Sequence, residues 1–133
     1  MSNQTLAQGF ARGKDKGHTL HMFIDGDTIY SYGYHFPIAR LIGARYALFN
    51  SDGYSNTTSR HKSHVYGALL EADKIIIECP QCDISQAREY LTEKVEAAQN
   101  KAKHARQAWS IERWNSEATR YNGQMGHLDV LTR

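Results

Sequence analysis

The sequence predicts an α+β fold, with an antiparallel β-meander, one short helix, a further strand and a long C-terminal helix. That long helix is expected either to pack on the sheet or to protrude from it. Three observations support this fold class. Residues 18–58 alternate β-prone runs with turn signals, residues 59–72 carry an apolar stripe at helical spacing, and residues 84–122 lack glycine and proline. We expect residues 1–17 to be a flexible or loosely docked tail and residues 18–133 to form a single domain.

The meander begins with two runs joined by Asp25-Gly26, a dipeptide that favours a hairpin turn. In the second run, aromatic residues occupy alternate positions, which places them on one face of the strand. These residues are Tyr30, Tyr32, Tyr34 and Phe36. Residues 37–42 and 45–50 predict a further pair of strands, and the apolar run at 74–79 predicts an internal strand.

The long helix is predicted over residues 84–122. Asp83 and Gln86 match the spacing of a capping box at its start, and Gly123 suits its end. Apolar residues between 91 and 109 repeat at alternating four- and three-residue steps, as in a coiled coil. Unbroken, this helix would span about 57 Å. It is therefore expected either to bend back or to meet another chain.

Composition places few limits on function. The 133 residues carry a formal net charge of +2, too little to indicate a nucleic-acid partner from charge alone. No apolar run approaches the roughly 20 residues of a transmembrane helix, and the first residues lack the apolar region of a secretory signal. We therefore expect a cytoplasmic protein without a membrane partner. Cys79 and Cys82 are then expected to be reduced thiols or metal ligands.

Hydroxyl and basic residues stand together at the predicted start of the first helix. They are Thr57, Thr58, Ser59, Arg60, His61 and Lys62. A helix N-terminus disfavours each cation by a few tenths to about 1 kcal/mol, whereas a bound phosphate accepts the unpaired N–H groups and attracts the cations. We predict a phosphate or nucleic-acid site here, unless Arg60 and Lys62 simply point into water. Arg40 and Arg45 would add charge to that site.

Two other features bear on binding partners. Tyr30, Tyr32 and Tyr34 are candidates to stack on bases, although a tyrosine row is also typical of a core beneath a helix. The long helix carries basic residues interspersed with glutamates, which indicates a mixed, solvated surface. Those basic residues are Lys94, Lys101, Lys103, His104, Arg106, Arg113 and Arg120. The alternative function is a protein-interaction module, in which this helix forms a homodimer seam or docks on a target protein.

Metal and redox sites are weaker hypotheses. His61, His64, Cys79 and Cys82 would complete a tetrahedral zinc set. The alternative is that both histidines border the core, because they continue the apolar stripe of their helix. The Cys-Pro-Gln-Cys motif between a strand and a helix also matches a thiol-redox position, but no proline follows it to supply the cis-proline of such folds. No cofactor is expected, apart from zinc in this alternative.

Acid–base catalysis has the least support. Asp25 and Asp27 flank Gly26 in a predicted turn, where aspartate is favoured for backbone reasons. A two-histidine nuclease would need His35 beside His61 or His64, which the sequence alone does not establish. An enzyme is therefore not the expected class.

Two segments are similar to a family of small uncharacterised proteins of bacteriophages and other mobile elements. They are YSYGYHFPIA at residues 30–39 and LFNSDGYSNTTSRHKSHV at residues 48–65. The resemblance covers residues 28–70 and transfers no catalytic role to any residue. It implies a small accessory protein in the host cytoplasm. Such a protein would bind nucleic acid, or would inhibit a host defence or transcription complex.

Overall fold

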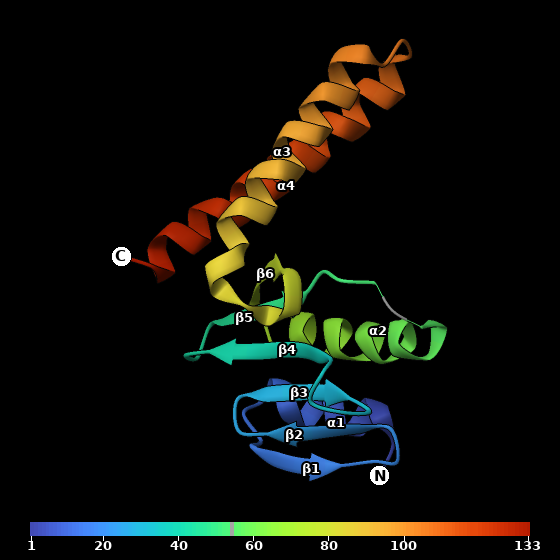
Figure 1. Ribbon diagram of the computed structural model, residues 1–133, viewed down its shortest axis with the longest axis vertical. Coiled ribbons are helices and arrows are strands. Elements are labelled where there is room, and N and C mark those ends of the chain that lie inside the picture. The colour runs from blue at the N-terminus through green and yellow to red at the C-terminus, as the bar shows by residue number, and fades with distance from the viewer. Residues whose placement is uncertain (54) are drawn as a thin grey trace. The chain divides into compact units, whose positions relative to one another are not determined.

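The computed structural model describes residues 1–53 and 55–133 and divides the chain into two compact units. The first unit, Met1–Asp83, contains a six-stranded sheet with helices α1 and α2, and the second, Ile84–Arg133, contains helices α3 and α4 (Figure 1). The predicted α+β class is confirmed. The single domain expected over residues 18–133 stays a prediction. Tyr54, in the strand or loop predicted before the first helix, lies outside the described residues.

The sheet is mostly antiparallel, and its strand order follows the sequence from β1 to β6. Antiparallel pairing joins β1 to β5 in succession, while β6 pairs with β5 in parallel after the intervening helix α2, Asn56–Glu71. The predicted hairpin at Asp25-Gly26 is confirmed, with Gly26 at φ 65°, where glycine carries no steric penalty. The strands are β1 Lys16–His18, β2 Met22–Asp25, β3 Thr28–Ser31, β4 Pro37–Ile42, β5 Tyr46–Asn50 and β6 Ile75–Cys79.

The predicted flexible tail is wrong, because residues Asn3–Ala11 form helix α1. Ser2 caps this helix by accepting a hydrogen bond from the Thr5 N–H, and Leu6 and Phe10 are fully buried. Apolar side chains recur one turn apart along this short segment, which gives it a face to bury despite its polar and glycine-containing composition. The N-terminal residues therefore belong to the core.

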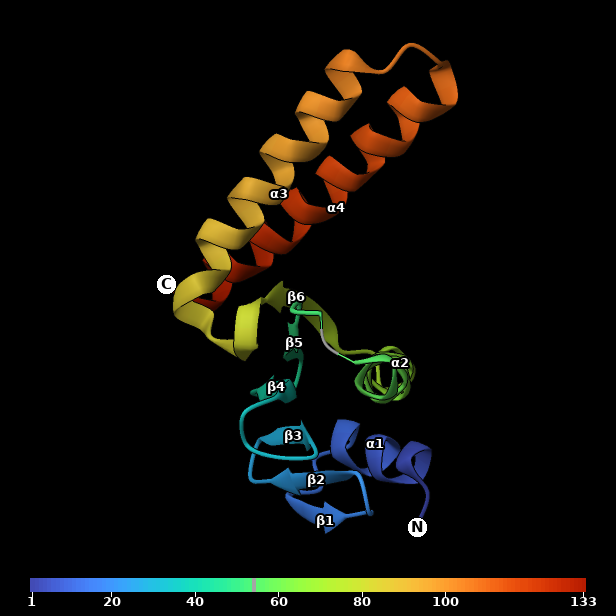
Figure 2. The same ribbon diagram turned by 45° about the vertical axis from the view of Figure 1, so that its right-hand side comes forward.

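The core of the first unit lies between the sheet and its two helices. Helices α1 and α2 pack against each other and cover the same face of the sheet (Figure 2). Ile24, Ile29 and Phe49 from the strands meet Phe10 and Leu69 from the helices in one buried cluster.

The predicted long helix is two helices, α3 Ile84–His104 and α4 Ala108–Leu131, so the boundary at residue 122 is wrong. The chain bends back at residues 105–107, and Gln107 has an extended backbone with ψ 140° (Figure 1). The two helices form an antiparallel hairpin, with an ion pair of 2.6 Å between Arg88 and Asp129. The apolar seam predicted for a homodimer contributes buried side chains to this hairpin within one chain: Leu91, Val95 and Ala98. No helix in the described part of the chain is long and apolar enough to cross a membrane.

Candidate functional site

Helix α2 begins three residues earlier than predicted. Its N-cap is Ser55, whose hydroxyl oxygen accepts a hydrogen bond from the Thr58 N–H at 3.2 Å. Arg60 consequently lies in the second turn of the helix. The helix dipole weakens beyond the first turn. Most of the electrostatic conflict that motivated a phosphate site at this position is therefore absent.

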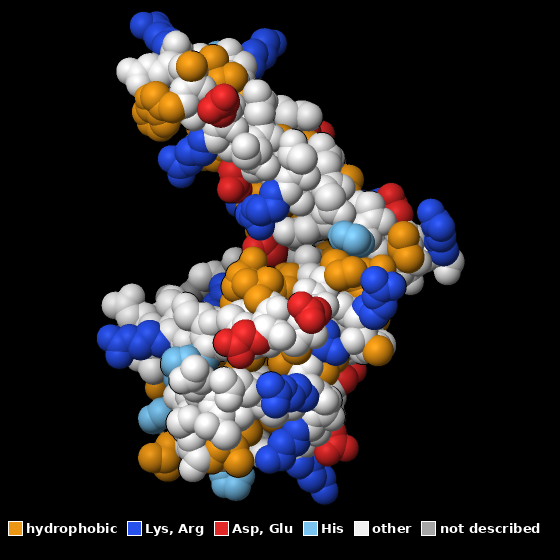
Figure 3. Space-filling model, turned by 180° about the vertical axis from the view of Figure 1, so that it is seen from behind, with side chains coloured by type: hydrophobic (Ala, Val, Ile, Leu, Met, Phe, Trp, Pro, Cys, Tyr) orange, Lys and Arg blue, Asp and Glu red, His pale blue; other side chains and the backbone are white. Residues whose placement is uncertain are grey.

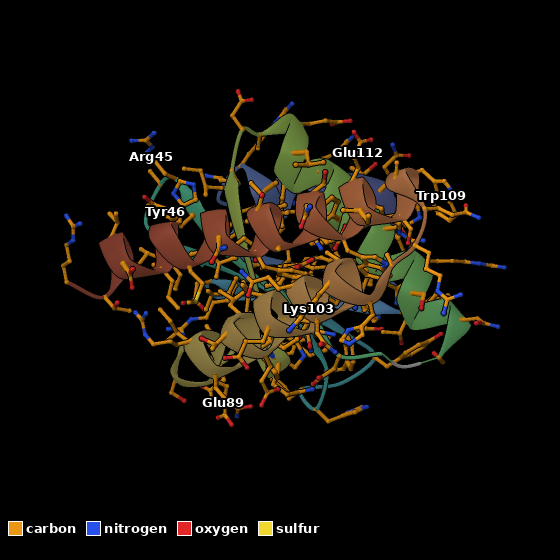
Figure 4. All side chains as sticks on the ribbon, turned by 90° about the horizontal axis from the view of Figure 1, so that it is seen from above. Arg45, Tyr46, Glu89, Lys103, Trp109 and Glu112 are labelled. Carbon is orange, nitrogen blue, oxygen red and sulfur yellow. The ribbon has the colours of Figure 1, made fainter. Side chains whose placement is uncertain are left out.

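Two of the predicted basic residues have partners of their own within the first unit. Lys62 is half-buried and its Nζ donates to the Asp52 carbonyl oxygen at 2.9 Å. Arg40 pairs with Asp27 at 3.1 Å, which helps to hold the pKa of that carboxyl group below its usual value against the opposing effect of burial. Arg45 precedes Tyr46 at the start of β5, whereas α2 follows the far end of that strand (Figure 4). Of the six residues predicted at the start of the helix, from Thr57 to Lys62, the exposed ones are Thr57, Ser59 and Arg60.

A chain of hydroxyl groups connects the N-cap of α2 to a buried histidine. Ser55 Oγ donates to Thr58 Oγ1 at 3.2 Å, Thr58 Oγ1 lies 3.2 Å from Ser31 Oγ, and Ser31 Oγ lies 2.8 Å from His61 Nδ1. Hydroxyl groups both donate and accept, so the bonds from Thr58 to Ser31 and from Ser31 to His61 can run in either direction, according to the tautomer of the His61 ring. The hydroxyl group of Thr58 and the ring of His61 therefore make these hydrogen bonds inside the protein.

The fold favours the neutral form of His61. Burial lowers the pKa of this side chain, and the neighbouring His21 and His64 lower it further. His21 is the histidine whose ring stacks near His61, with centroids 6.0 Å apart, and Tyr32 contacts both rings. The two-histidine hypothesis had instead invoked His35.

His61 should make the free energy of unfolding depend on pH. Its folded-state pKa lies below the unfolded value near 6.5, so the unfolded chain binds the proton first on acidification. Stability that is fully present above that value is therefore lost as the pH falls toward the folded pKa. We expect His61→Gln to reduce the loss of stability between about pH 8 and about pH 5, measured by chemical unfolding. A wild-type slope in His61→Gln would contradict the prediction.

The predicted aromatic row is broken. Strand β3 ends at Ser31, and Tyr32 has φ 64°, so the alternation of side chains stops there. Tyr30 and Tyr34 pack with Phe23 in one cluster, with ring centroids 4.9–5.0 Å apart. Tyr34 also donates to Asp25, which raises the pKa of the tyrosine. Phe36 enters the core, so the four rings share no continuous stacking face.

The surroundings of the two cysteines do not favour thiol-redox chemistry. Both are buried, and burial raises the pKa of Cys79 to about 12 and that of Cys82 further still. A reactive thiol needs its thiolate stabilised, so the thiol-redox hypothesis lacks its physical basis. Among the described residues, no group of three or more His, Cys, Asp or Glu side chains is placed to hold a metal ion. The zinc set of His61, His64, Cys79 and Cys82 is accordingly not assembled.

A basic and aromatic surface occurs where sequence reasoning did not place a site. We call residues 101–114 the hairpin tip, which comprises the end of α3, the connecting residues and the start of α4. Its basic side chains are Lys101, Lys103, His104, Arg106 and Arg113, and Glu112 is its acidic residue. In Figure 3, blue Lys and Arg side chains surround hydrophobic side chains at this end of the hairpin.

Two indoles belong to the hairpin tip. Trp109 is 63% exposed, and Figure 4 places it at the turn end of the hairpin. Two cations lie near the ring of the half-buried Trp114: Lys101 Nζ is 4.2 Å and Arg113 Cζ is 4.8 Å from its centroid. The available sequence signal was the basic run at 101–106 followed by two tryptophans. This signal was missed because the charges were considered together over one unbroken helix.

No family model, curated protein sequence or solved structure matches this chain. The resemblance to mobile-element proteins over residues 28–70 therefore stays a prediction. Function is inferred below from side-chain chemistry alone.

Proposed function

We propose that this chain binds nucleic acid, with the hairpin tip as the principal contact. The observation that carries the proposal is that two cations at the half-buried Trp114 and the exposed indole of Trp109 occur together at the end of the α3–α4 hairpin. Lysine and arginine bind backbone phosphates, and an exposed indole can stack on an unpaired base. Together they favour a single-stranded or locally opened nucleic acid.

Folding alone explains only part of this surface. Lys101 and Lys103 lie in the last turn of α3, where cations interact favourably with the helix dipole. Arg106 lies beyond that helix, and Arg113 lies inside α4, so the same explanation does not cover them. The exposure of Trp109 leaves a large apolar group in water, a feature more typical of interaction surfaces.

The start of α2 is a secondary contact in this proposal. Arg60 is exposed there, with the exposed hydroxyl residues Thr57 and Ser59 on the same part of the helix. This arrangement retains one cation of the site expected from sequence. The role of an accessory protein of a phage or similar element is consistent with such binding and remains part of the proposal.

Replacing Lys101, Lys103 and Arg106 together with alanine tests the principal contact. Each cation that neutralises a phosphate contributes about 0.7 to the slope of log affinity against log salt for single strands. We expect the triple variant to flatten that slope by about 2. Fluorescence anisotropy with labelled single-stranded DNA and RNA of the same sequence, over a salt series, measures it.

The matched control is the triple change Arg12→Ala, Lys14→Ala and Lys16→Ala, which removes the same charge from exposed positions in the first unit. It should leave most of the slope intact. Trp109→Ala should weaken binding with little change in slope, because stacking releases no counterions. Equal effects of the two triple variants, or no binding at low salt, would refute the proposal.

A further inference from the structure

A hollow of about 410 Å³ opens beside the second and third turns of α2. Its lining residues all belong to the first unit: Phe49, Ser59, Lys62, Ser63, Tyr66 and Gly67. Its volume falls within the range of pockets that hold small ligands, roughly 300–1,000 Å³. None of these residues belongs to the hairpin tip.

One wall of the hollow is aromatic. Phe49 from β5 and Tyr66 from α2 meet edge to face, with centroids 5.2 Å apart and planes at 70°. Phe49 is almost fully buried, and its position is fixed by the core, whereas Tyr66 is partly exposed. A planar ring of a ligand would find an apolar contact and a preferred edge-to-face geometry at this wall.

A cation and hydroxyl groups line the same hollow. Lys62 Nζ lies 5.4 Å from the Phe49 ring centroid, so the ammonium group adjoins the aromatic wall. An ammonium group has three donors, which lets Lys62 bind an anion while it keeps its bond to Asp52. Ser63 Oγ donates to the Ser59 carbonyl, which orients that hydroxyl group on the helix surface.

Gly67 keeps this part of α2 open. A glycine in a helix interior costs roughly 0.5–1 kcal/mol relative to alanine. A Cβ added at Gly67 would meet no atom within 4 Å, so crowding does not require glycine at this position. Helix α2 is therefore less stable than it would be with alanine at this position. Such a cost is expected when the open space beside the residue serves a function.

We propose that this hollow binds a small molecule that combines a planar ring with a negatively charged group. The ring packs against Phe49 and Tyr66, and the anion binds Lys62. Nucleoside monophosphates and aromatic carboxylates share this chemistry. The site is independent of nucleic-acid binding at the hairpin tip, so either proposal can fail while the other stands.

Titration of the protein with adenosine monophosphate and with indole acetate, followed by NMR chemical shifts, tests the site and distinguishes the two sources. At least one of them should bind saturably, and uncharged adenosine should bind less tightly than its monophosphate. Lys62→Met should weaken binding about tenfold or more, as expected for the loss of a charge-assisted hydrogen bond. Lys16→Met removes the same charge from an exposed position outside the hollow, and it should leave the affinity unchanged.

Filling the hollow provides a second test that does not depend on Lys62. Gly67→Leu should abolish binding, since the added side chain enters open space, and thermal unfolding should show a fold at least as stable as the wild type. Gly67→Ala adds only a methyl group and should keep most of the affinity. The proposal is overturned if neither probe binds, or if Gly67→Leu and Lys62→Met bind as the wild type does.

Discussion

Replacing Phe10 with alanine is expected to lower the free energy of unfolding of the first unit by about 3–5 kcal/mol. The side chain is fully buried in α1 and belongs to the same cluster as Ile24 and Ile29 of the sheet. Truncation removes the transfer free energy of a benzyl group and leaves a cavity that the surrounding strands can only partly fill. The loss is a large fraction of the roughly 5–15 kcal/mol by which folded proteins are typically stable.

The measurement must report on the first unit. The two tryptophans of the chain, Trp109 and Trp114, both lie in the second unit, so tryptophan fluorescence is unsuitable. Amide hydrogen exchange of the strands, or urea unfolding followed by circular dichroism, reports on the sheet. Gln4→Ala changes an exposed residue of the same helix and should stay within about 0.5 kcal/mol. If Phe10→Ala were equally mild, residues 3–11 would not contribute to the core.

Asn50→Ala is expected to lower the free energy of unfolding by about 2–5 kcal/mol, because it leaves three partly buried backbone groups without their partners. The carboxamide of Asn50 is fully buried at the end of β5. Its Nδ2 donates to the Pro37 carbonyl at 2.7 Å, and its Oδ1 accepts from the N–H groups of Asp52 and Gln81 at 2.9 and 3.1 Å. One side chain therefore joins β4, the segment after β5 and the 3₁₀ turn Pro80–Cys82.

Asn50→Asp separates the acceptor function of the side chain from its donor function. The carboxylate keeps the acceptor for Asp52 and Gln81, but it places a charge beside the Pro37 carbonyl, so this variant should also be destabilised. Asn56→Ala, at an exposed position in the first turn of α2, is the matched control and should change stability by less than about 0.5 kcal/mol. Urea unfolding compares the three, and equal stability of Asn50→Ala and Asn56→Ala would contradict the assigned role.

Strong local patterns in the sequence predicted much of the first unit. The Asp25-Gly26 turn fixes the β2–β3 hairpin, and the apolar run at 74–79 contains β6, because both signals depend on a few neighbouring residues. Helix α1 was missed because its apolar face is only nine residues long and becomes stable through contacts with distant strands. The sequence contains no glycine or proline at the break between α3 and α4. Packing of the two helices against each other compensates for the interruption of the helix.

The candidate sites were harder to predict, since each depends on where a side chain points. Thr58 and His61 have the composition of an anion site, but the earlier start of α2 turns them toward Ser31 and the interior. The cations of the hairpin tip come together only when the chain reverses at residues 105–107. The hollow beside Gly67 requires Phe49, a residue from another element, and no spacing within α2 indicates it.

The order of elements along the chain has a consequence for biosynthesis. Every strand of the sheet, including the parallel partner of β5, is supplied before residue 80, and both long helices come afterwards. Domains generally fold as units, N-terminal first, during synthesis. The sheet, with α1 and α2 on its face, thus has all its hydrogen-bonding partners available while the α3–α4 hairpin is still being made on the ribosome. Each unit is continuous in sequence, so neither has to wait for a segment from the other to complete its secondary structure.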